Sequence, residues 1–211
     1  MRLFRREERA ENAPIRLHIG CGQEAIPGWI NIDNQALPGV DRVLDVRRGL
    51  PFSDVAAIYA EHFLEHLALE EGLAFLRACR RALARSGVLR LSTPNLDWVW
   101  ITNYRMGQAA RDEAIRDCFQ LNRAFHGWGH QFLYNRAALE AVLKAAGFAS
   151  VVFQRYGHSD LPELTGIERH ETWSDTPEIP HVLIAEASGR AVEEPLPEEM
   201  LREFREAIGT R

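Results

Sequence analysis

The sequence predicts an α/β fold, because short apolar segments of strand length alternate along its 211 residues with segments of helical periodicity. Seven segments have the length and composition of strands: 15–19, 29–32, 42–44, 56–59, 88–92, 150–155 and 181–186. With 46% hydrophobic residues, a chain of this length can bury one core of ordinary size. We therefore expect residues 15–188 to form one domain on a seven-stranded sheet.

Two helices are predicted where apolar residues recur at helical spacing. The first covers 69–83, and Gly87 follows it as a stop signal. The second covers 136–146, with Asn135 as its N-cap and Gly147 at its C-terminal end. Both helices are amphipathic, so we expect each to cover a face of the sheet.

Three further segments surround this core. Residues 1–14 form an N-terminal extension, and residues 95–134 form a helical insertion followed by a loop after the fifth strand. The insertion is expected over the carboxyl edge of the sheet, where open α/β folds bind ligands. Residues 189–211 form a linker and a C-terminal amphipathic helix. That helix either docks on its own domain or contacts a homodimer mate or another partner protein.

Charge and composition argue against several classes of protein. The net charge of −5 disfavours a nucleic-acid-binding protein, which normally needs a basic face. No apolar run reaches the roughly 18 to 20 residues of a membrane span. The first residues mix Arg and Glu without an apolar segment, so we expect a cytoplasmic protein rather than a secreted one. The three cysteines are widely spaced and predict neither a disulfide framework nor a zinc-thiolate site.

A glycine-bounded turn follows the first predicted strand directly. Gly20 and Gly22 flank Cys21 there, and glycine lets the backbone turn sharply and approach a ligand. The second predicted strand leads into Asp33, about a dozen residues further on. A carboxylate at the tip of a neighbouring strand is well placed to accept hydrogen bonds from a ribose diol. Together these features predict a nucleoside site more strongly than either does alone.

Five motifs occur in a characteristic order: LHIGCG at 17–22, GWINID at 28–33, DVRRGLPF at 45–52, EHFLEHL at 61–67 and SGVLRLSTPN at 86–95. In this order and spacing they resemble the class I S-adenosylmethionine-dependent methyltransferases. More narrowly, they resemble the small predicted methyltransferases, type 11-like, of bacterial cell-surface polysaccharide gene clusters. The resemblance implies a Rossmann-like fold with helices on both faces of a seven-stranded, mostly parallel sheet whose last strand is antiparallel.

The same resemblance implies S-adenosylmethionine as the methyl donor and assigns residues to it. Gly20, Cys21 and Gly22 match the loop under the methionine part, and Asp33 matches the carboxylate that holds the ribose hydroxyls. The remaining matches are Asp45 and Val46 at the adenine, and Glu61 and His62 at the end of the fourth strand, where donor and acceptor meet.

The chain also departs from the family pattern. His18 stands where most class I members have an acidic residue, and it either hydrogen-bonds the donor's amino group or is a buried strand histidine satisfied by the backbone. Glu24 replaces the third glycine of the usual motif. Only residues 23–28 separate Gly22 from the second strand, too few for a full crossover helix, so we expect a turn or a single helical turn.

Methyl transfer to a hydroxyl requires a base, and histidine has a suitable unperturbed pKa of about 6.5. His62 is the first candidate for this base and His66 the second, although His66 could equally cap and pack the following helix. Glu65 joins them as a candidate catalytic residue, because some relatives that modify lipids use a similar Glu-His pair.

The sequence leaves glycan, small-metabolite, lipid and protein acceptors open, and the resemblance favours a sugar or a glycan precursor. His126, Trp128, His130 and Tyr134 belong to a glycine-rich aromatic loop that could cover the acceptor, with Trp128 and Tyr134 offering faces for stacking. The two histidines of this loop are four residues apart, as in zinc proteases, but the glycines between them disfavour a helix, so no metal site is predicted.

Two other functions stay open. A nicotinamide-dependent oxidoreductase shares the glycine turn and the strand-tip acid, but it needs GxGxxG at the start of a full helix. A non-catalytic module could keep the fold and bind S-adenosylmethionine or S-adenosylhomocysteine while acting through a protein partner. The joint presence of Gly20, Gly22, Asp33 and Asp45 favours the methyltransferase.

Overall fold

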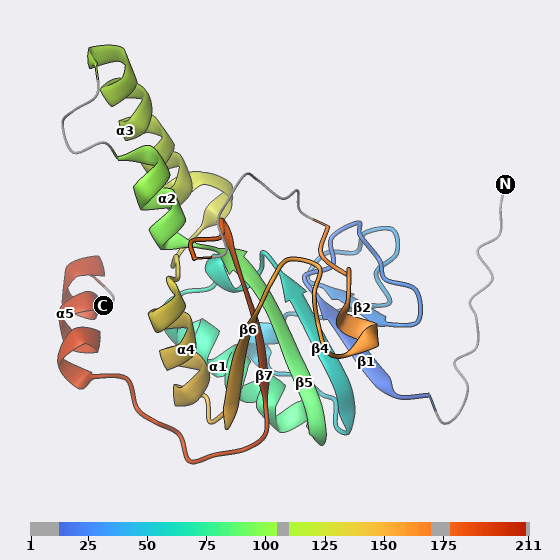
Figure 1. Ribbon diagram of the computed structural model, residues 1–211. Coiled ribbons are helices and arrows are strands. Elements are labelled where there is room, and N and C mark those ends of the chain that lie inside the picture. The colour runs from blue at the N-terminus through green and yellow to red at the C-terminus, as the bar shows by residue number, and fades with distance from the viewer. Residues whose placement is uncertain (1–12, 105–109, 170–177, 210–211) are drawn as a thin grey trace, which may run out of the picture.

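The computed structural model describes residues 13–104, 110–169 and 178–209, so most of the expected extension 1–14 lies outside the described residues. Within the described residues, seven strands form one sheet in the order β3-β2-β1-β4-β5-β7-β6 (Figure 1). The strands are β1 (Ile15–Ile19), β2 (Ile30–Asp33), β3 (Arg42–Val43), β4 (Val55–Glu61), β5 (Leu83–Pro94), β6 (Ser150–Gln154) and β7 (Val182–Ser188). All seven predicted strands are confirmed.

The sheet has the predicted mixture of directions. β1 pairs in parallel with β2 and β4, β2 with β3, and β4 with β5. β7 lies between β5 and β6 and is antiparallel to both. β2 and β3 lie on one side of β1 in the sheet, and β4 and the later strands lie on the other. The carboxyl ends of β1 and β4 therefore form a topological switch point, where such sheets bind ligands.

One face of the sheet packs against helices α1 (Leu69–Ala82) and α4 (Arg136–Ala145). Alternate residues of β4, Ile58 and Ala60, belong to this larger core. The predicted cap of α4 is confirmed, because the side-chain oxygen of Asn135 accepts a hydrogen bond of 2.9 Å from the Ala138 amide. The helix ends as expected at Gly147, whose φ of +85° is a left-handed conformation.

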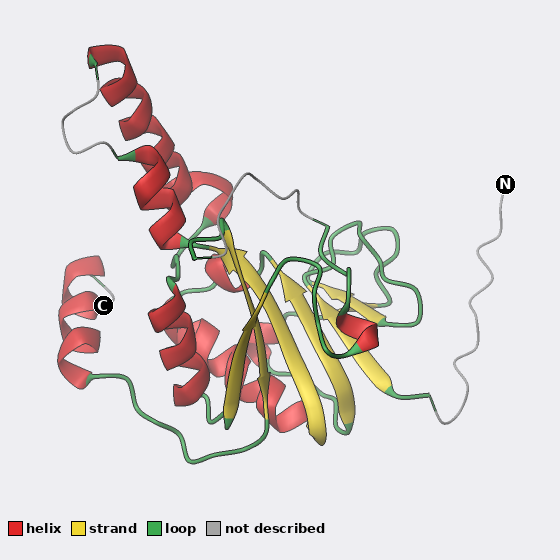
Figure 2. Ribbon diagram, viewed as in Figure 1, coloured by secondary structure: helices red, strands yellow, loops and turns green. Residues whose placement is uncertain are grey.

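The other face of the sheet carries a thinner cover. Tyr59 of β4 faces a second cluster that includes Trp29, Leu164 and Ile167. Most of this cover is a loop with one short 3₁₀ helix, η4 (Pro162–Leu164), in front of the sheet in Figure 2. Where helices were expected on both faces, the described residues place the α-helices α1 and α4 on one, because the β1–β2 connection is too short for a crossover helix.

The boundary between α1 and β5 differs from the prediction. The helix ends at Ala82, and the strand begins at once with Leu83. Gly87, expected as a helix stop, lies inside β5 instead. A Cβ atom at Gly87 would lie 2.5 Å from the carbonyl oxygen of Val55, so glycine allows β4 and β5 to approach at an irregular point in their register.

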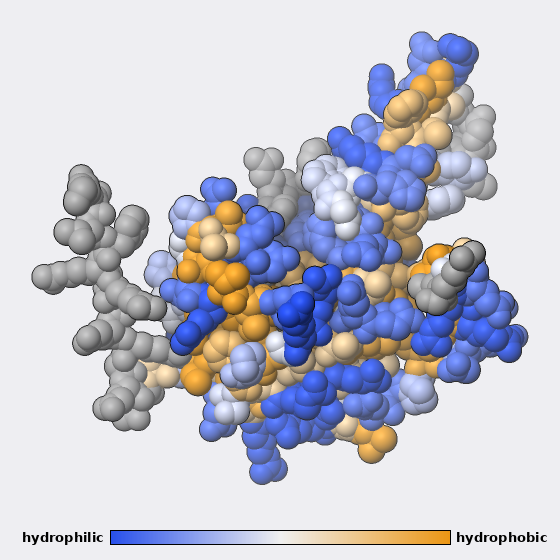
Figure 3. Space-filling view, turned by 180° about the vertical axis from the view of Figure 1, so that it is seen from behind, coloured by the Kyte–Doolittle hydropathy of each residue, from blue (hydrophilic) through white to orange (hydrophobic). Residues whose placement is uncertain are grey.

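The predicted insertion is a pair of helices, α2 (Leu96–Asn103) and α3 (Arg111–His126). α2 starts at the carboxyl end of β5, and the pair projects beyond the sheet (Figure 1). Hydrophobic side chains show among hydrophilic ones on this projection in the reverse view (Figure 3). In these two helices, Trp100, Ile101 and Phe119 are 48%, 58% and 73% exposed.

The C-terminal helix α5 (Glu198–Ile208) packs on its own domain. The Phe204 ring lies 5.5 Å from the Phe132 ring, measured between centroids, and Arg205 Nε donates to Glu70 Oε1 at 2.8 Å. Of the two alternatives for this helix, the structure therefore shows the intramolecular one. None of the helices in the described part of the chain combines the length and the apolar character that crossing a membrane requires.

Candidate functional site

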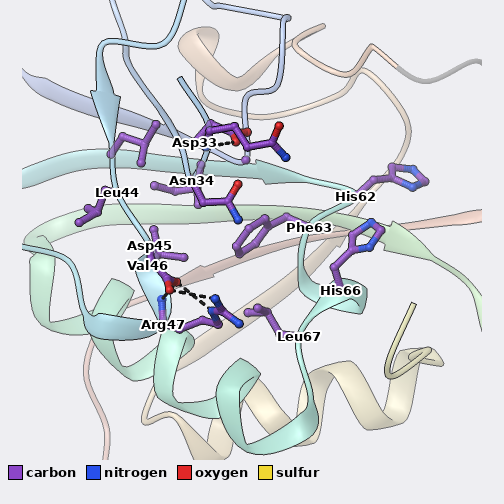
Figure 4. A pocket seen from close by; sticks show the side chains of 14 residues that line it. Asp33, Asn34, Leu44, Asp45, Val46, Arg47, His62, Phe63, His66 and Leu67 are labelled. Atoms are coloured by element: carbon purple, nitrogen blue, oxygen red, sulfur yellow. Dashed lines mark hydrogen bonds and ion pairs between the residues drawn. The ribbon is translucent and has the colours of Figure 1, made fainter. Parts of the chain in front are cut away.

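A cavity of about 450 Å³ opens at the carboxyl ends of β1, β2 and β4. Its volume lies within the usual range for small-molecule sites. Figure 4 shows Asp33 and Asp45 on one side of it and His62 and His66 on the other, with Phe63 between them. The lining residues are Ile19, Gly20, Ile32, Asp33, Asn34, Gln35, Leu44, Asp45, Val46, Arg47, His62, Phe63, His66 and Leu67.

The glycine turn after β1 forms one end of this cavity. Gly20 and Gly22 have φ angles of +66° and +52°, which favour glycine. A Cβ atom at Gly20 would lie 2.6 Å from Phe63 Cδ2, so a side chain there would displace the ring from the cavity wall. Residues 20–29, all described, form turns without a helix, as the short spacing predicts.

Asp33 joins the tip of β2 to this turn. Its Oδ2 accepts a hydrogen bond of 2.9 Å from the Gly22 amide, and its Oδ1 accepts one of 3.0 Å from the Gln35 amide. Each oxygen keeps a second lone pair. The carboxylate is therefore held in one orientation at the cavity wall while it can still accept hydrogen bonds from a ligand.

Asp45 begins a short 3₁₀ helix, η1 (Val46–Arg48), that closes another side of the cavity. Its Oδ1 accepts from the Arg47 amide at 3.1 Å, and the two carboxylate oxygens accept from Arg47 Nε and Nη2, each at 2.9 Å. The guanidinium of Arg47 holds the pKa of Asp45 below its ordinary value. A bidentate arginine therefore keeps Asp45 ionised and oriented.

His62 follows β4 with unusual backbone geometry. Its φ of +45° is rare for a residue other than glycine and marks strain that is often found at functional sites. Its amide donates to the Ser92 carbonyl at 2.8 Å, and its Nδ1 lies 3.3 Å from Glu65 Oε1. The side chain is 19% exposed, so it reaches the cavity from a largely enclosed position.

Glu65 lies in the 3₁₀ helix η2 (Leu64–His66), and its side chain is fully buried. Its Oε2 accepts a hydrogen bond of 3.0 Å from Thr93 Oγ1 at the end of β5. Its backbone carbonyl accepts from the amides of Gln131 and Phe132 at 2.7 and 3.2 Å. The loop after α3 is thereby held directly against η2.

This contact brings together two histidines that the sequence separates by more than sixty residues. The rings of His66 and His130 lie 5.1 Å apart between centroids, at 67° to one another. Ligand atoms of Glu65, His66 and His130 all lie within 4.8 Å of each other. The sequence analysis treats EHFLEHL and the glycine-rich aromatic loop as separate motifs and misses this cluster, which a long-range contact creates.

Four of the residues assigned to the donor do not line the cavity. His18 points to the opposite face of the sheet, because β1 alternates and Leu17 and Ile19 face the helices. Its ring stacks on Tyr59, its Nδ1 lies 3.2 Å from Asn31 Oδ1, and burial lowers its pKa. This corrects the expectation of a contact with the donor and supports the alternative of a buried strand histidine, with the Asn31 side chain rather than the backbone as its partner.

The other three lie near the cavity without lining it. Cys21 is buried, and burial raises the pKa of its thiol to about 11. Gly22 acts through its amide on Asp33. Both carboxylate oxygens of Glu61 accept from the backbone amide of Arg169, at 3.0 and 3.1 Å, so this residue anchors the loop over the second face.

The residues expected on the acceptor side divide into three environments. Trp128, in the 3₁₀ turn η3 (Gly127–Gly129), is 68% exposed and lies under the guanidinium of Arg123, while His126 is exposed at the end of α3. His130 is half-buried against His66. Tyr134 is only 1% exposed and belongs to the core, which corrects the expectation that its ring stacks on an acceptor.

Comparison with known proteins bears on the fold. No protein-family model matches the chain, and no curated protein matches its sequence. Among solved structures, the DhpI complex with S-adenosylhomocysteine has a TM-score of 0.50 and 16% identity over 84% of this chain and 77% of DhpI. A S-adenosylmethionine-dependent methyltransferase from Archaeoglobus fulgidus has a TM-score of 0.51 and 17% identity over 83% of this chain and 86% of that one.

A third structure, the S-adenosylmethionine-dependent methyltransferase SibL in its apo form, has a TM-score of 0.52 and 13% identity over 85% of this chain. The chain spans about half of that protein, 51% of its length, and 50% of PigF, a further match with a TM-score of 0.48. Identities this low bear on the fold alone. With the strand order and the antiparallel β7, they show that the chain has the Rossmann-like class I methyltransferase fold, with a helical insertion after the fifth strand.

Proposed function

We propose that this protein is an S-adenosylmethionine-dependent methyltransferase that acts on a hydroxyl group of a small molecule or glycan precursor. One observation carries the proposal: Asp33 and Asp45, from two different strand ends, line the same cavity as His62. A nucleoside needs acceptors for its ribose hydroxyls and its amino group, and these two carboxylates supply both.

The residues present fit this donor. Asp33 would accept from the ribose hydroxyls, and Asp45 would accept from the adenine amino group beside the backbone of Val46. The absence of a Cβ atom at Gly20 lets the Phe63 ring pack against the turn and form the cavity wall beside it. S-adenosylmethionine supplies, when bound, a methyl group already activated on a sulfonium. The solved structure of DhpI contains S-adenosylhomocysteine, which supports the same donor class here.

His62 is the proposed base. The carboxylate of Glu65, 3.3 Å from Nδ1, favours the tautomer with its proton on that nitrogen. Nε2 is then the atom that accepts a proton from the acceptor's hydroxyl. Thr93 fixes Glu65 through Oε2, so Glu65 is a positioning residue for this histidine. His66, which also lines the cavity, is the second candidate for contact with the acceptor.

The donor assignment is tested by Asp33→Asn. This variant keeps a side-chain oxygen for the glycine turn but removes the charge and one acceptor. We expect affinity for S-adenosylhomocysteine to fall about 10- to 100-fold, since a hydrogen bond to a charged group contributes about 1.5 to 3 kcal/mol. Calorimetric titration measures this fall, and thermal unfolding with ligand present at 100 times Kd should show about 2.7 kcal/mol of stabilisation in the wild type.

Asp160→Asn is the matched control, because Asp160 is exposed and does not line the cavity. It should bind S-adenosylhomocysteine as the wild type does. Equal affinity in Asp33→Asn and the wild type would refute the ribose assignment. Stabilisation by NAD instead of S-adenosylhomocysteine would replace the methyltransferase with the oxidoreductase.

A further inference from the structure

We propose that Glu65, His66 and His130 form a binding site for a divalent transition-metal ion at the wall of the cavity. Two of these residues come from η2 and the third from the loop after α3. The site therefore exists only where the folded chain joins these two segments. Its existence does not depend on the methyltransferase proposal, although the role suggested for it below does.

The ligand atoms of the three side chains lie slightly farther apart than they would around a bound metal ion. Their ligand atoms lie within 4.8 Å of one another. A tetrahedral ion about 2.1 Å from each ligand would hold the ligand atoms about 3.4 Å apart. The half-buried His66 side chain, whose ring already meets that of His130 edge to face, would make this movement while His130 keeps its orientation.

Glu65 supplies the strongest reason to expect a cation. Its carboxylate is fully buried, and Oε2 accepts a hydrogen bond from Thr93. Among the described residues, Oε1 faces the imidazole of His62 at the ion-pair distance of 3.3 Å and accepts no well-formed hydrogen bond. Burying a carboxylate is costly unless a positive charge or hydrogen bonds compensate it. A bound cation supplies that compensation.

His130 is oriented as metal-binding histidines usually are. Its Nδ1 lies 2.7 Å from the carbonyl oxygen of Ala124, so the Nδ1 proton is donated to the backbone. The lone pair is then on Nε2, which is the atom left for a metal. Such an outer hydrogen bond fixes both the tautomer and the ring orientation of a histidine ligand.

Backbone contacts hold the ligands from the two segments in place. Gln131, next to His130, donates from its amide to the Glu65 carbonyl at 2.7 Å and from Nε2 to the His66 carbonyl at 2.8 Å. One residue thereby clamps both ligands of η2 to the ligand of the loop. A site that is organised before binding loses less conformational entropy when the ion arrives.

The donor set indicates which ions bind. Two imidazoles and one carboxylate suit Zn²⁺ and other first-row transition ions, whereas Mg²⁺ prefers oxygen ligands. Three protein ligands leave a fourth position, and His66 borders the cavity. The ligand class for that position is a hydroxyl or carboxylate oxygen of the acceptor. On the proposed function, the ion would hold the acceptor oxygen in reach of His62.

The experiment measures metal binding to the whole chain after chelator treatment and dialysis. Zn²⁺ is titrated by calorimetry, and Co²⁺ by its visible absorption, which reports ligand geometry. We expect one ion per chain, with much weaker binding of Mg²⁺. His130→Ala should weaken Zn²⁺ binding by at least about 100-fold, since losing even an outer-shell partner costs roughly 10- to 100-fold.

His126→Ala is the matched control, because His126 is an exposed histidine four residues before His130 and outside the cluster. It should bind Zn²⁺ as the wild type does. His66→Gln provides a second test on η2, and circular dichroism verifies that both variants fold. Wild-type affinity in His130→Ala, loss of binding in His126→Ala, or absence of stoichiometric binding in the wild type would each overturn the proposal.

Titration with S-adenosylhomocysteine on the same samples separates this inference from the proposed function. Zn²⁺ binding without S-adenosylhomocysteine binding would leave the metal site standing and remove the methyltransferase. S-adenosylhomocysteine binding without Zn²⁺ binding would overturn the metal site and leave the methyltransferase proposal standing. His130→Ala should leave S-adenosylhomocysteine affinity unchanged, because His130 does not line the donor cavity.

Discussion

His62 has two properties that a residue of purely structural importance would not need together. Its backbone is held at φ of +45°, and its imidazole faces a buried carboxylate while lining the cavity. Left-handed backbone costs free energy in a residue with a Cβ atom, so the surrounding structure must maintain it. The left-handed backbone places the ring at the end of β4, beside the cavity, where the proposed function needs a base.

His62→Asn tests this role, because asparagine tolerates the left-handed conformation better than most residues. We expect turnover with the acceptor identified by screening nucleotide sugars and glycans to fall about 10²- to 10⁴-fold. The Kd for S-adenosylhomocysteine should stay close to the wild-type value. His158→Asn, at an exposed histidine, is the control, and unchanged turnover in His62→Asn would remove His62 from the reaction.

His18 makes stability depend on pH. Burial holds its pKa below the ordinary value of 6.5, so the unfolded chain takes up a proton on this group at a pH where the folded chain does not. Its contribution to the free energy of unfolding therefore falls as pH decreases below about 6.5. Denaturant titrations between about pH 7 and pH 5 should show a smaller fall in His18→Gln than in the wild type. An equal fall in the free energy of unfolding for His18→Gln and the wild type would contradict this assignment.

For single residues, the sequence predicts which residue types belong to the site better than it predicts which way their side chains face. The structure brings Asp33, Asp45 and His62 to one cavity, because each lies at the end of a strand or shortly after it. His18 lies away from the cavity, because which face a strand residue occupies depends on its register in the sheet. Tyr134 lies outside the strands, in the loop before α4, and tertiary packing buries it in the core. Only the packing of β1 shows that His18 faces Tyr59.

The turn after β1 contains a natural pair of matched glycines. Gly20 and Gly22 have similar positive φ angles, but only Gly20 has a neighbour, Phe63, within 4 Å of the Cβ position. Substitution by alanine therefore separates the cost of the backbone conformation from the cost of the contact. The two glycines therefore serve as test and control for each other.

Gly22→Ala should destabilise the protein by about 1 to 2 kcal/mol, the cost of the left-handed conformation for an L-residue. Gly20→Ala should cost more and should also weaken S-adenosylhomocysteine binding, because Phe63 must leave its position in the cavity wall. Chemical denaturation and calorimetry measure the two effects. In the Gly20→Ala background, Phe63→Leu should recover part of the loss, and equal destabilisation by both alanines would show that the contact with Phe63 is unimportant.

Element boundaries were predictable where a local signal sets them. Asn135 caps α4 and Gly147 ends it, both as the sequence indicates, because a cap acts within a few residues. Gly87 misled the prediction, since its role depends on Val55 in a neighbouring strand. The missing helix after Gly22 was predictable from chain length alone.

The thin cover on the second sheet face depends on a buried ionic network. Arg90 of β5 donates from Nε to Glu168 at 2.7 Å and from Nη1 to Glu186 of β7 at 2.5 Å. Glu168 also accepts from the Gly157 amide at 3.2 Å. Two strands and a loop are thus tied through one side chain that is itself fully buried.

Arg90→Met should destabilise the whole molecule by about 3 to 5 kcal/mol, because it leaves two carboxylates without their cation in a largely water-free environment. Arg85→Met is the control on the same strand, since Arg85 is exposed, and it should stay within about 0.5 kcal/mol of the wild type. Urea denaturation followed by circular dichroism measures both. Adding Glu168→Gln to Arg90→Met should recover part of the lost stability. Equal stability of Arg90→Met and Arg85→Met would contradict this account.

Contacts between distant segments mark the limit of what the sequence predicts about the site. The cavity is lined by residues between 19 and 67, which are close in sequence, and Asp33, Asp45 and His62 among them belong to the motifs of the sequence. The cluster of Glu65, His66 and His130 depends on the path of the chain through α2 and α3. The geometry of that path is set by tertiary packing, which no local pattern records.

The position of β7 also determines when a newly made chain can finish folding. Residues 182–188 leave the ribosome after those of β6, yet they must lie between β5 and β6. At about 5 to 20 residues per second, the roughly 90 residues that follow β5 take about 5 to 20 s to synthesise. Throughout this interval the nascent chain presents the unpaired edge of β5, which chaperones can protect and neighbouring nascent chains can bind.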